Sequence, residues 1–250
     1  MAAENPFLDH PEPIRLSNCK PFGVGGRRAC YVHPHEPRFC IKVLRQDDDR
    51  TVRIKKSASW IPARLRREYD NNQDERDTLN GLQKKVGPKL REHFPWCHGE
   101  IDTDLGRGLV LDLVRDYDGR ISYSLREHIT RGLSLEEVRP AFERFARFLM
   151  KHRIITKAIL DHNLALSKAT PGKWHFYLID GMGTNAFFPF ASLLPALAYR
   201  KITQKIEEAW ARFEAFSAQG GVSDQLRKES TWGQGFLNHR DDVSHKRLDP

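Results

Sequence analysis

The chain has 250 residues, of which 39% are hydrophobic and 30% are charged, a composition typical of a globular protein with a sizeable core. No stretch approaches the roughly 20 apolar residues that cross a bilayer, and no basic segment followed by an apolar one opens the sequence. We therefore expect neither a transmembrane helix nor a secretory signal. The net charge of +8 favours anionic partners such as nucleotide, nucleic acid, phospholipid or an acidic protein, without selecting among them.

The four cysteines give no sign of a metal site or of a disulfide framework. They are Cys19, Cys30, Cys40 and Cys97, and none forms a Cys-x-x-Cys pair. Reduced cysteines in strands act as small hydrophobic residues. We expect a structural role for them and a cytoplasmic location, because the cytoplasm keeps thiols reduced.

The N-terminal segment is predicted to form three strands after a flexible arm. Residues 1–15 are rich in proline and polar residues, which predicts the arm. Strands are expected between residues 16 and 44, with a glycine-rich turn that contains Gly23, Gly25 and Gly26. The third strand alternates apolar residues with a set that includes Lys42.

A charged helix and a hairpin follow. Pro62 suits the first turn of a helix that we expect to run to about Lys85. Two strands, over 96–102 and 108–114, then read as a hairpin. The polar break after them predicts the boundary between two lobes.

The second half is predicted to be mostly helical. Ser134 and Glu137 have the spacing of a capping box, and the residues that follow at helical spacing form one apolar face. That face consists of Val138, Phe142, Phe145 and Leu149. Pro140 is expected to kink this helix or to shift its start. A last helix is predicted over 192–216, and the composition of 217–250 predicts a disordered tail.

Asp180 is the most informative residue of the chain. It ends an apolar run that begins at His175, and Gly181 follows it. Asn163 lies 17 residues upstream, in a loop that we expect to join Asp180 through a small hairpin. A carboxylate and an amide oxygen are ligands that Mg²⁺ accepts, so the pair predicts a metal site that carries phosphate. A buried Asp that only caps a turn is the plainer alternative.

Gly23 to Gly26 and Lys42 predict the nucleotide side of such a site. Glycines between two strands let backbone N–H groups approach phosphates, and Arg28 just after them adds charge. A strand Lys that pairs with a helix carboxylate contacts the α- and β-phosphates in phosphotransferases, and Glu68 is the predicted partner of Lys42. A tight hairpin and a solvent-facing Lys are the alternatives.

A basic stretch separates the third strand from the helix. Between Arg50 and Arg67 there are seven Lys or Arg residues and no acidic residue. This stretch is either a solvated loop or an anion-docking patch with Trp60 as an aromatic contact.

The ordered set of motifs resembles a protein-kinase-like fold, and it is more closely similar to the YrbL family of PhoP regulatory network proteins. The resemblance covers roughly residues 16–215. Its segments are Phe22–Pro34, Cys40–Lys42, Arg66–Glu68, His98–Gly99, Arg153–Thr156, Asn163 and Asp180. The family implies a cytoplasmic bacterial protein whose expression follows the PhoP–PhoQ system, which responds to Mg²⁺ and envelope stress. It implies no known reaction.

The sequence also departs from active kinases. The catalytic aspartate of such a site would stand five residues before Asn163, where this chain has Ala158. Alanine can neither orient an attacking hydroxyl nor take its proton. Loss of a positioned base typically costs a factor of about 10²–10⁴ in rate, so the sequence leaves enzymatic activity open.

These observations lead to one main hypothesis and two alternatives. The main one is an α+β, bilobal protein-kinase-like domain over 16–216, with an N-lobe over 16–115 and a C-lobe over 116–216. It would bind ATP and Mg²⁺, face adenine with Leu113 to Arg115, and regulate an unidentified protein partner as a pseudokinase. The alternatives are a weakly active kinase or nucleotide-dependent transferase, and a basic module that binds nucleic acid or acidic lipid through Arg50–Arg67.

Overall fold

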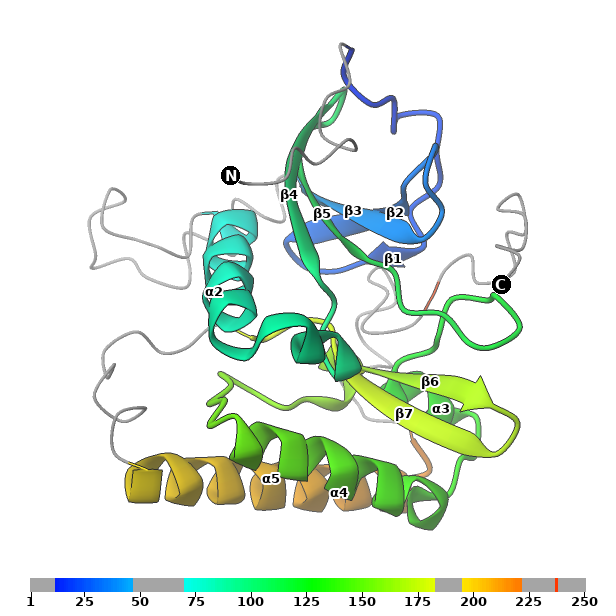
Figure 1. Cartoon of the computed structure of the whole chain (residues 1–250). Helices are drawn as coiled ribbons and strands as arrows, with labels where there is room; N and C mark the ends of the chain where they lie inside the picture. The colour runs from blue at the N-terminus through cyan, green and yellow to red at the C-terminus, as the bar shows by residue number, and fades with distance from the viewer. Residues whose placement is uncertain (1–11, 47–69, 183–194, 222–236, 238–250) are drawn as a thin grey trace, which may run out of the picture.

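The computed structural model describes residues 12–46, 70–182, 195–221 and 237. It has a sheet-rich part, drawn above, and a helical part, drawn below (Figure 1). The expected α+β class is confirmed, because a five-stranded antiparallel sheet is combined with several helices and a separate two-stranded hairpin. No helix among the described residues is both long enough and apolar enough to cross a membrane.

The five-stranded sheet has the order β1-β2-β3-β5-β4, and every neighbouring pair is antiparallel. The strands agree with the predicted ones to within a few residues, apart from the first, which is short and lies within the glycine segment. Their bounds are β1 Gly23–Val24, β2 Arg28–Val32, β3 Phe39–Leu44, β4 Cys97–Thr103 and β5 Gly106–Asp112.

The residues just before the sheet are held against it. Ile14 belongs to the segment expected to be a flexible arm, yet its side chain is buried. Its N–H donates to the Asp102 carbonyl at 2.9 Å, and the Asp104 N–H donates back to the Ile14 carbonyl at 3.0 Å. Residues 1–11 lie outside the described residues.

Helix α2 (Asn71–Val86) packs on the sheet and begins later than predicted. Asp70 is the N-cap, and its carboxylate accepts hydrogen bonds from the N–H groups of Asn72 and Gln73. This side-chain cap satisfies the first free N–H groups of the helix, which fixes its start at Asn71 rather than at Pro62. The short 3₁₀ helix η3 (Gly87–Glu92) follows α2 directly.

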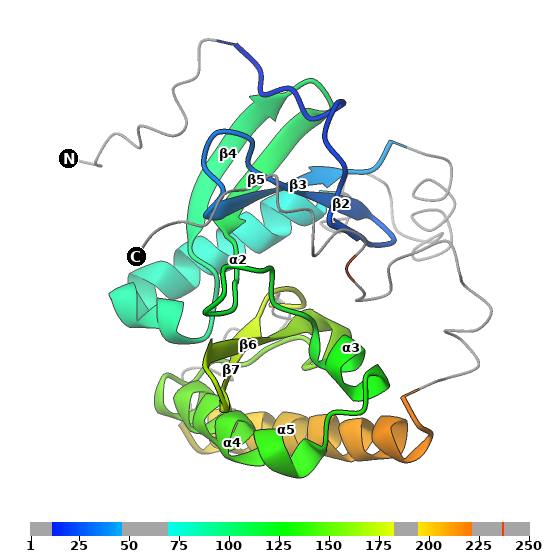
Figure 2. The same ribbon diagram turned by 90° about the vertical axis from the view of Figure 1, so that its right-hand side faces the viewer.

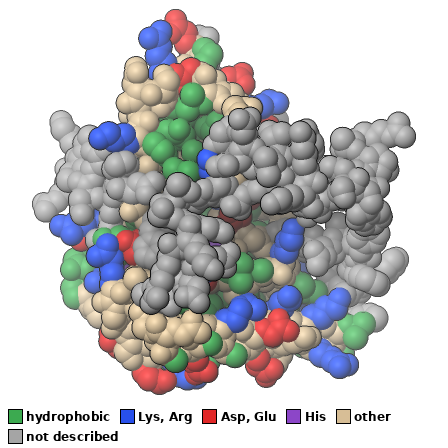
Figure 3. Space-filling model, turned by 180° about the vertical axis from the view of Figure 1, so that it is seen from behind, with side chains coloured by type: hydrophobic (Ala, Val, Ile, Leu, Met, Phe, Trp, Pro, Cys, Tyr) green, Lys and Arg blue, Asp and Glu red, His purple; other side chains and the backbone are tan. Residues whose placement is uncertain are grey.

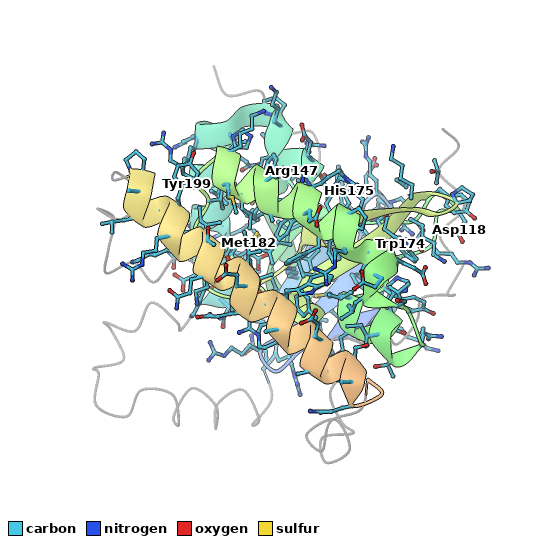
Figure 4. The ribbon with its side chains drawn as sticks, turned by 90° about the horizontal axis from the view of Figure 1, so that it is seen from below. Asp118, Arg147, Trp174, His175, Met182 and Tyr199 are labelled. Carbon is cyan, nitrogen blue, oxygen red and sulfur yellow. The ribbon has the colours of Figure 1, made fainter. Side chains whose placement is uncertain are left out.

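The helical part contains two long helices that lie side by side beneath a hairpin, as the view from below makes clear (Figure 4). The hairpin joins Asn163 to Asp180, as the sequence predicted. The elements of this part are α3 Leu125–Thr130, α4 Leu135–Lys151, η4 Asp161–Asn163, β6 Leu164–Thr170, β7 Lys173–Leu178 and α5 Pro195–Ala218. Acidic and basic side chains both occur on its surface (Figure 3).

Helix α4 buries its predicted apolar face but starts without the predicted capping box. Ser134 is the N-cap residue, yet its side chain makes no capping hydrogen bond. The helix runs from Leu135 to Lys151 with Pro140 inside it, so it continues past the proline although that residue cannot donate an intrahelical hydrogen bond.

An aromatic cluster connects α4, the hairpin and α5. The ring of Phe142 lies 5.6 Å from those of both Phe176 and Phe213, and 5.1 Å from that of Trp210, measured between centroids. Because Phe142 is buried among residues from three elements, it fixes how the hairpin sits on the helices.

Replacement of Phe142 by Ala should lower the free energy of unfolding by about 3–5 kcal/mol, because it removes a large buried side chain and leaves a cavity. Arg147→Ala, on the same helix but with a side chain 67% exposed, is the matched control and should stay within about 0.5 kcal/mol of wild type. Denaturant unfolding measures both, and equal losses in the two variants would contradict this account of the core.

His93 is a buried histidine at the end of η3. It is 4% exposed, its ring stacks on that of His175 at 4.6 Å, and its Nδ1–H donates to the Phe176 carbonyl at 2.8 Å. Burial lowers the pKa of His93 to about 4. The hydrogen bond to the Phe176 carbonyl opposes this by raising the pKa, whereas His175 and Arg144 lower it further.

The fold should therefore lose stability as the pH falls from 6.5 towards 4. Between pH 6.5 and 4 the unfolded chain binds a proton at His93 that the folded chain does not bind. The contribution of the neutral His93 to the free energy of unfolding is therefore fully present above pH 6.5 and decreases below it. The difference from 6.5 to about 4 corresponds to roughly 3 kcal/mol. Urea unfolding across this range should show a flatter profile for His93→Asn, which keeps a donor but does not titrate. Parallel profiles would contradict the assignment.

Candidate functional site

A cavity of about 420 Å³ lies where the sheet-rich and helical parts meet. The connection from β5 to α3 runs between the two parts beside it (Figure 2). Most of the residues singled out by the sequence line this cavity, although they are far apart in the chain. They are Gly23, Gly25, Gly26, Lys42, Leu113, Asn163 and Asp180.

Two of the predicted site residues do not belong to this set. Arg115 directs its guanidinium to backbone carbonyls, donating to Pro37 at 2.6 Å and to Gly119 at 2.8 Å. It thus fastens the connection after β5 and is not among the residues that line the cavity, so its expected place facing adenine stays a prediction. Glu68 lies outside the described residues, as does the basic stretch Arg50–Arg67.

The glycine segment forms a tight hairpin over the cavity. Gly25 donates its N–H to the Arg28 carbonyl at 2.8 Å, and Phe22 donates to the Cys30 carbonyl at 2.9 Å. None of Gly23, Gly25 and Gly26 has a positive φ angle. A Cβ atom at Gly23 or Gly25 would make only ordinary contacts with the protein. Neither a positive φ nor close packing therefore explains Gly23 and Gly25, and all three glycines line the cavity.

Lys42 meets its helix partner at Glu75. The Lys42 ammonium lies 2.7 Å from the Glu75 carboxylate and donates to the Ile179 carbonyl, also at 2.7 Å. Burial alone would lower the pKa of Lys42, but Glu75 and Asp180 raise it above its ordinary value, so the side chain stays charged. The predicted type of pair is therefore present, with Glu75 as the carboxylate that the structure describes.

Arg28 joins the same network from β2. Its guanidinium forms an ion pair with Glu75 and a second one with Asp180, at 2.8 Å from Oδ2. Asp180 Oδ1 accepts the Gly181 N–H at 2.6 Å. Desolvation would raise the pKa of Asp180, but Arg28 and Lys42 hold that pKa well below its usual range. The carboxylate is thus ionised, and its side chain is 51% exposed.

Asn163 and Asp180 are brought together by the ends of the hairpin. The Ile179 N–H donates to the Asn163 carbonyl at 2.8 Å. Gly181 has a φ of 73°, and a Cβ there would lie 2.6 Å from Asn163 Nδ2 and 3.0 Å from the Ala158 carbonyl. The Asp-Gly sequence is therefore required by the close approach of Asn163, as well as by the backbone conformation.

The donor set suits Mg²⁺ in its chemistry, with one carboxylate and one amide oxygen on the same wall of the cavity. Each Asp180 oxygen already accepts from one protein donor but keeps a further lone pair, so a metal ion could bind beside the Arg28 guanidinium, against the repulsion of its positive charge. Among the described residues there is no cluster of three or more His, Cys, Asp or Glu side chains that could hold a metal by itself.

Among the residues that the structure describes, the carboxylate nearest in sequence to Ala158 is not free to replace the missing base. Asp161 is the nearest carboxylate in sequence, but Arg126 binds it through two hydrogen bonds, of 2.7 and 2.9 Å. Although burial opposes ionisation, His162 and Arg126 hold the pKa of Asp161 well below its usual range. A carboxylate so engaged is a poor proton acceptor.

Sequence reasoning missed Glu75 and Leu237. Asn72, Glu75 and Leu79 are all buried at helical spacing, and Asp70 before them is a helix-capping residue, so this pattern was available in the sequence. Leu237 lies within the predicted disordered tail, yet it lines the cavity and donates its N–H to Glu127 at 3.0 Å. No sequence signal identifies that contact.

We expect Gly181→Ala to destabilise the chain by roughly 2 kcal/mol or more, because it adds a collision with Asn163 to the strain of a positive φ. Gly119→Ala is the matched control, since Gly119 has a φ of 81° with no atom within 4 Å of its added Cβ. It should cost only about 1 kcal/mol. Guanidinium unfolding of both variants tests this, and a loss at Gly181 no greater than at Gly119 would refute the close approach.

Comparison with known proteins connects this site to a family. The family model described as "PhoP regulatory network protein YrbL" matches residues 14–214, which include every described residue of the charged network. The chain is also 27% identical over 221 residues to the uncharacterized protein YrbL of Escherichia coli (strain K12), covering 86% of this chain and 92% of that protein. The match to the uncharacterized protein YrbL of Shigella flexneri has the same identity and coverage. The chain therefore belongs to the YrbL family of PhoP regulatory network proteins.

Proposed function

We propose that the chain binds ATP in the cavity between its two parts and acts as a pseudokinase-type regulator within the PhoP regulatory network. The observation that carries the proposal is the buried Lys42–Glu75 ion pair in a cavity that a glycine hairpin also lines. In protein kinases a strand Lys held by a helix Glu contacts the nucleotide phosphates under a glycine-rich loop. On the basis of this shared Lys–Glu pair and glycine-rich loop, we also propose that the sheet-rich and helical parts correspond to the two lobes of a kinase-like fold.

Each wall of the cavity would take a different part of the nucleotide. Gly23 to Gly26 would cover the phosphates, and Lys42 would contact the α- and β-phosphates. Leu111 and Leu113 supply apolar surface beside the connection after β5, which suits an adenine ring. Asn163 and Asp180 would hold Mg²⁺ beside the Arg28 guanidinium. A regulator that binds ATP would act in the cytoplasm, where ATP is present.

Ala158 and Asp161 favour regulation over catalysis. The position expected for the base carries a methyl group, and the nearby Asp161 is held by Arg126. Phosphoryl transfer depends mainly on positioning and on charge stabilisation, so a weakly active kinase or transferase is the second candidate. Slow transfer of labelled phosphate or adenylate that is lost in Asp180→Ala would favour that candidate over a regulator. The basic-module alternative rests on Arg50–Arg67, which lies outside the described residues, and it stays a prediction.

ATP with Mg²⁺ should raise the melting temperature of the wild-type chain, because a ligand that binds only the folded state stabilises it. At a concentration of 100 times Kd the gain is about 2.7 kcal/mol. Lys42→Met should abolish the rise while remaining folded, since Glu75 keeps its ion pair with Arg28.

Lys89→Met is the matched control, because Lys89 is exposed on η3 and is absent from the cavity lining. It should respond to ATP as the wild type does. A wild-type chain that is folded and shows no shift with ATP, with or without Mg²⁺, would sink the proposal.

A further inference from the structure

Arg28 is a permanent positive charge placed against the carboxylate that would bind a metal. Its side chain is only 10% exposed, and it spans from β2 to Glu75 on α2 and to Asp180 after β7. Burial would lower the pKa of Arg28, but Asp180 and Glu75 raise it further above its ordinary value. The guanidinium therefore stays charged at any pH at which the chain is folded.

The charges of the network balance without a metal ion. Arg28 and Lys42 contribute two positive charges, and Glu75 and Asp180 contribute two negative ones. A site with only one Lys and two carboxylates would carry a net negative charge, and a divalent cation would have to offset it before phosphates could enter. Here the second protein cation already offsets it.

The geometry of Arg28 also suits phosphate. A guanidinium presents several N–H donors in a planar fork, and such forks bind phosphate oxygens in pairs. Arg28 lines the cavity beside the glycine hairpin, on the same side as Lys42. An entering polyphosphate would thus meet two fixed cations, whereas Mg²⁺ would compete with Arg28 for Asp180.

We propose that Arg28 is an internal counter-ion that takes over much of the role of the divalent cation, so that the cavity binds a nucleoside polyphosphate with little dependence on Mg²⁺. This inference rests on the proposed function and makes Arg28 the residue that sets the metal requirement. It also gives a physical reason why a chain without a catalytic base could retain nucleotide binding without the metal that the transfer reaction needs.

The test is the Kd for ATP measured by calorimetry in EDTA and in excess Mg²⁺, with each protein first shown to be folded by circular dichroism. The wild type should give two values within about tenfold of each other. Arg28→Gln removes the charge but keeps a polar side chain of similar length. Its Kd in EDTA should rise by about tenfold or more, the size expected for the loss of a charged hydrogen bond to phosphate.

In Mg²⁺ the Arg28→Gln variant should bind nearly as well as wild type, because Asp180 becomes free to hold the ion. Arg107→Gln is the control for net charge, since its side chain is 71% exposed on the far end of the sheet hairpin, and its two Kd values should match those of wild type. Arg28→Lys, which keeps the charge but loses the fork, should fall in between and covers the case in which Arg28→Gln does not fold.

The outcomes separate the two proposals. The deciding quantity is the ratio of the Kd for ATP in EDTA to that in Mg²⁺. If this ratio is 100 or more for wild type and is unchanged in Arg28→Gln or Arg28→Lys, Arg28 has only a structural role. The inference about Arg28 then fails, although ATP binding still stands. If folded wild type binds ATP in neither buffer, the nucleotide proposal fails and the inference falls with it.

Discussion

Glu75 accepts ion pairs from two cations at once, and the candidate site depends on that arrangement. A buried carboxylate is costly unless it is paired, and here it is paired by Lys42 from β3 and Arg28 from β2. Asn72, one turn before it on α2, donates to the Lys42 carbonyl at 2.8 Å. Helix and sheet are thus joined by polar contacts at the point where the cavity begins. Arg28 also forms an ion pair with Asp180, and Lys42 donates to the Ile179 carbonyl. These two contacts connect the sheet-rich part to the helical part.

This joint has a functional consequence, because the contacts that hold the two parts together are also the groups that a phosphate ligand would use. A ligand that draws Lys42 or Arg28 towards itself would change the contacts between β2, α2 and the segment after β7. Binding of a nucleotide would therefore change how the sheet-rich part contacts the helical part. A regulator that does not catalyse a reaction needs such a ligand-dependent change. Differential contact of this kind is the physical basis of a ligand-dependent switch.

Local patterns predicted the elements well and the long-range partners less well. The alternation around Lys42 and the helical spacing of Phe142 each indicated the correct element, because burial imposes those periods on the sequence. The start of α2 was expected at Pro62, nine residues before Asn71, where the helix capped by Asp70 begins. Glu68 was chosen as partner from its place on that expected helix and lies outside the described residues, whereas Glu75, further along the same helix, pairs with Lys42. Arg115 was placed at the site by its proximity in sequence to Leu113, but its guanidinium binds the Pro37 and Gly119 carbonyls, contacts that no local pattern indicates.

The sequence by itself determined the inventory of the site: a glycine hairpin, a strand Lys, an Asn and an Asp joined by a hairpin, and an alanine where a base would stand. It could do so because each of these features is a local pattern of residue types. Only the tertiary structure decided that Arg28 bridges Glu75 and Asp180, and that Leu237 reaches the cavity from far along the chain. Those contacts join elements separated by tens of residues, and the pairing of buried charges depends on three-dimensional distance, which no local pattern encodes.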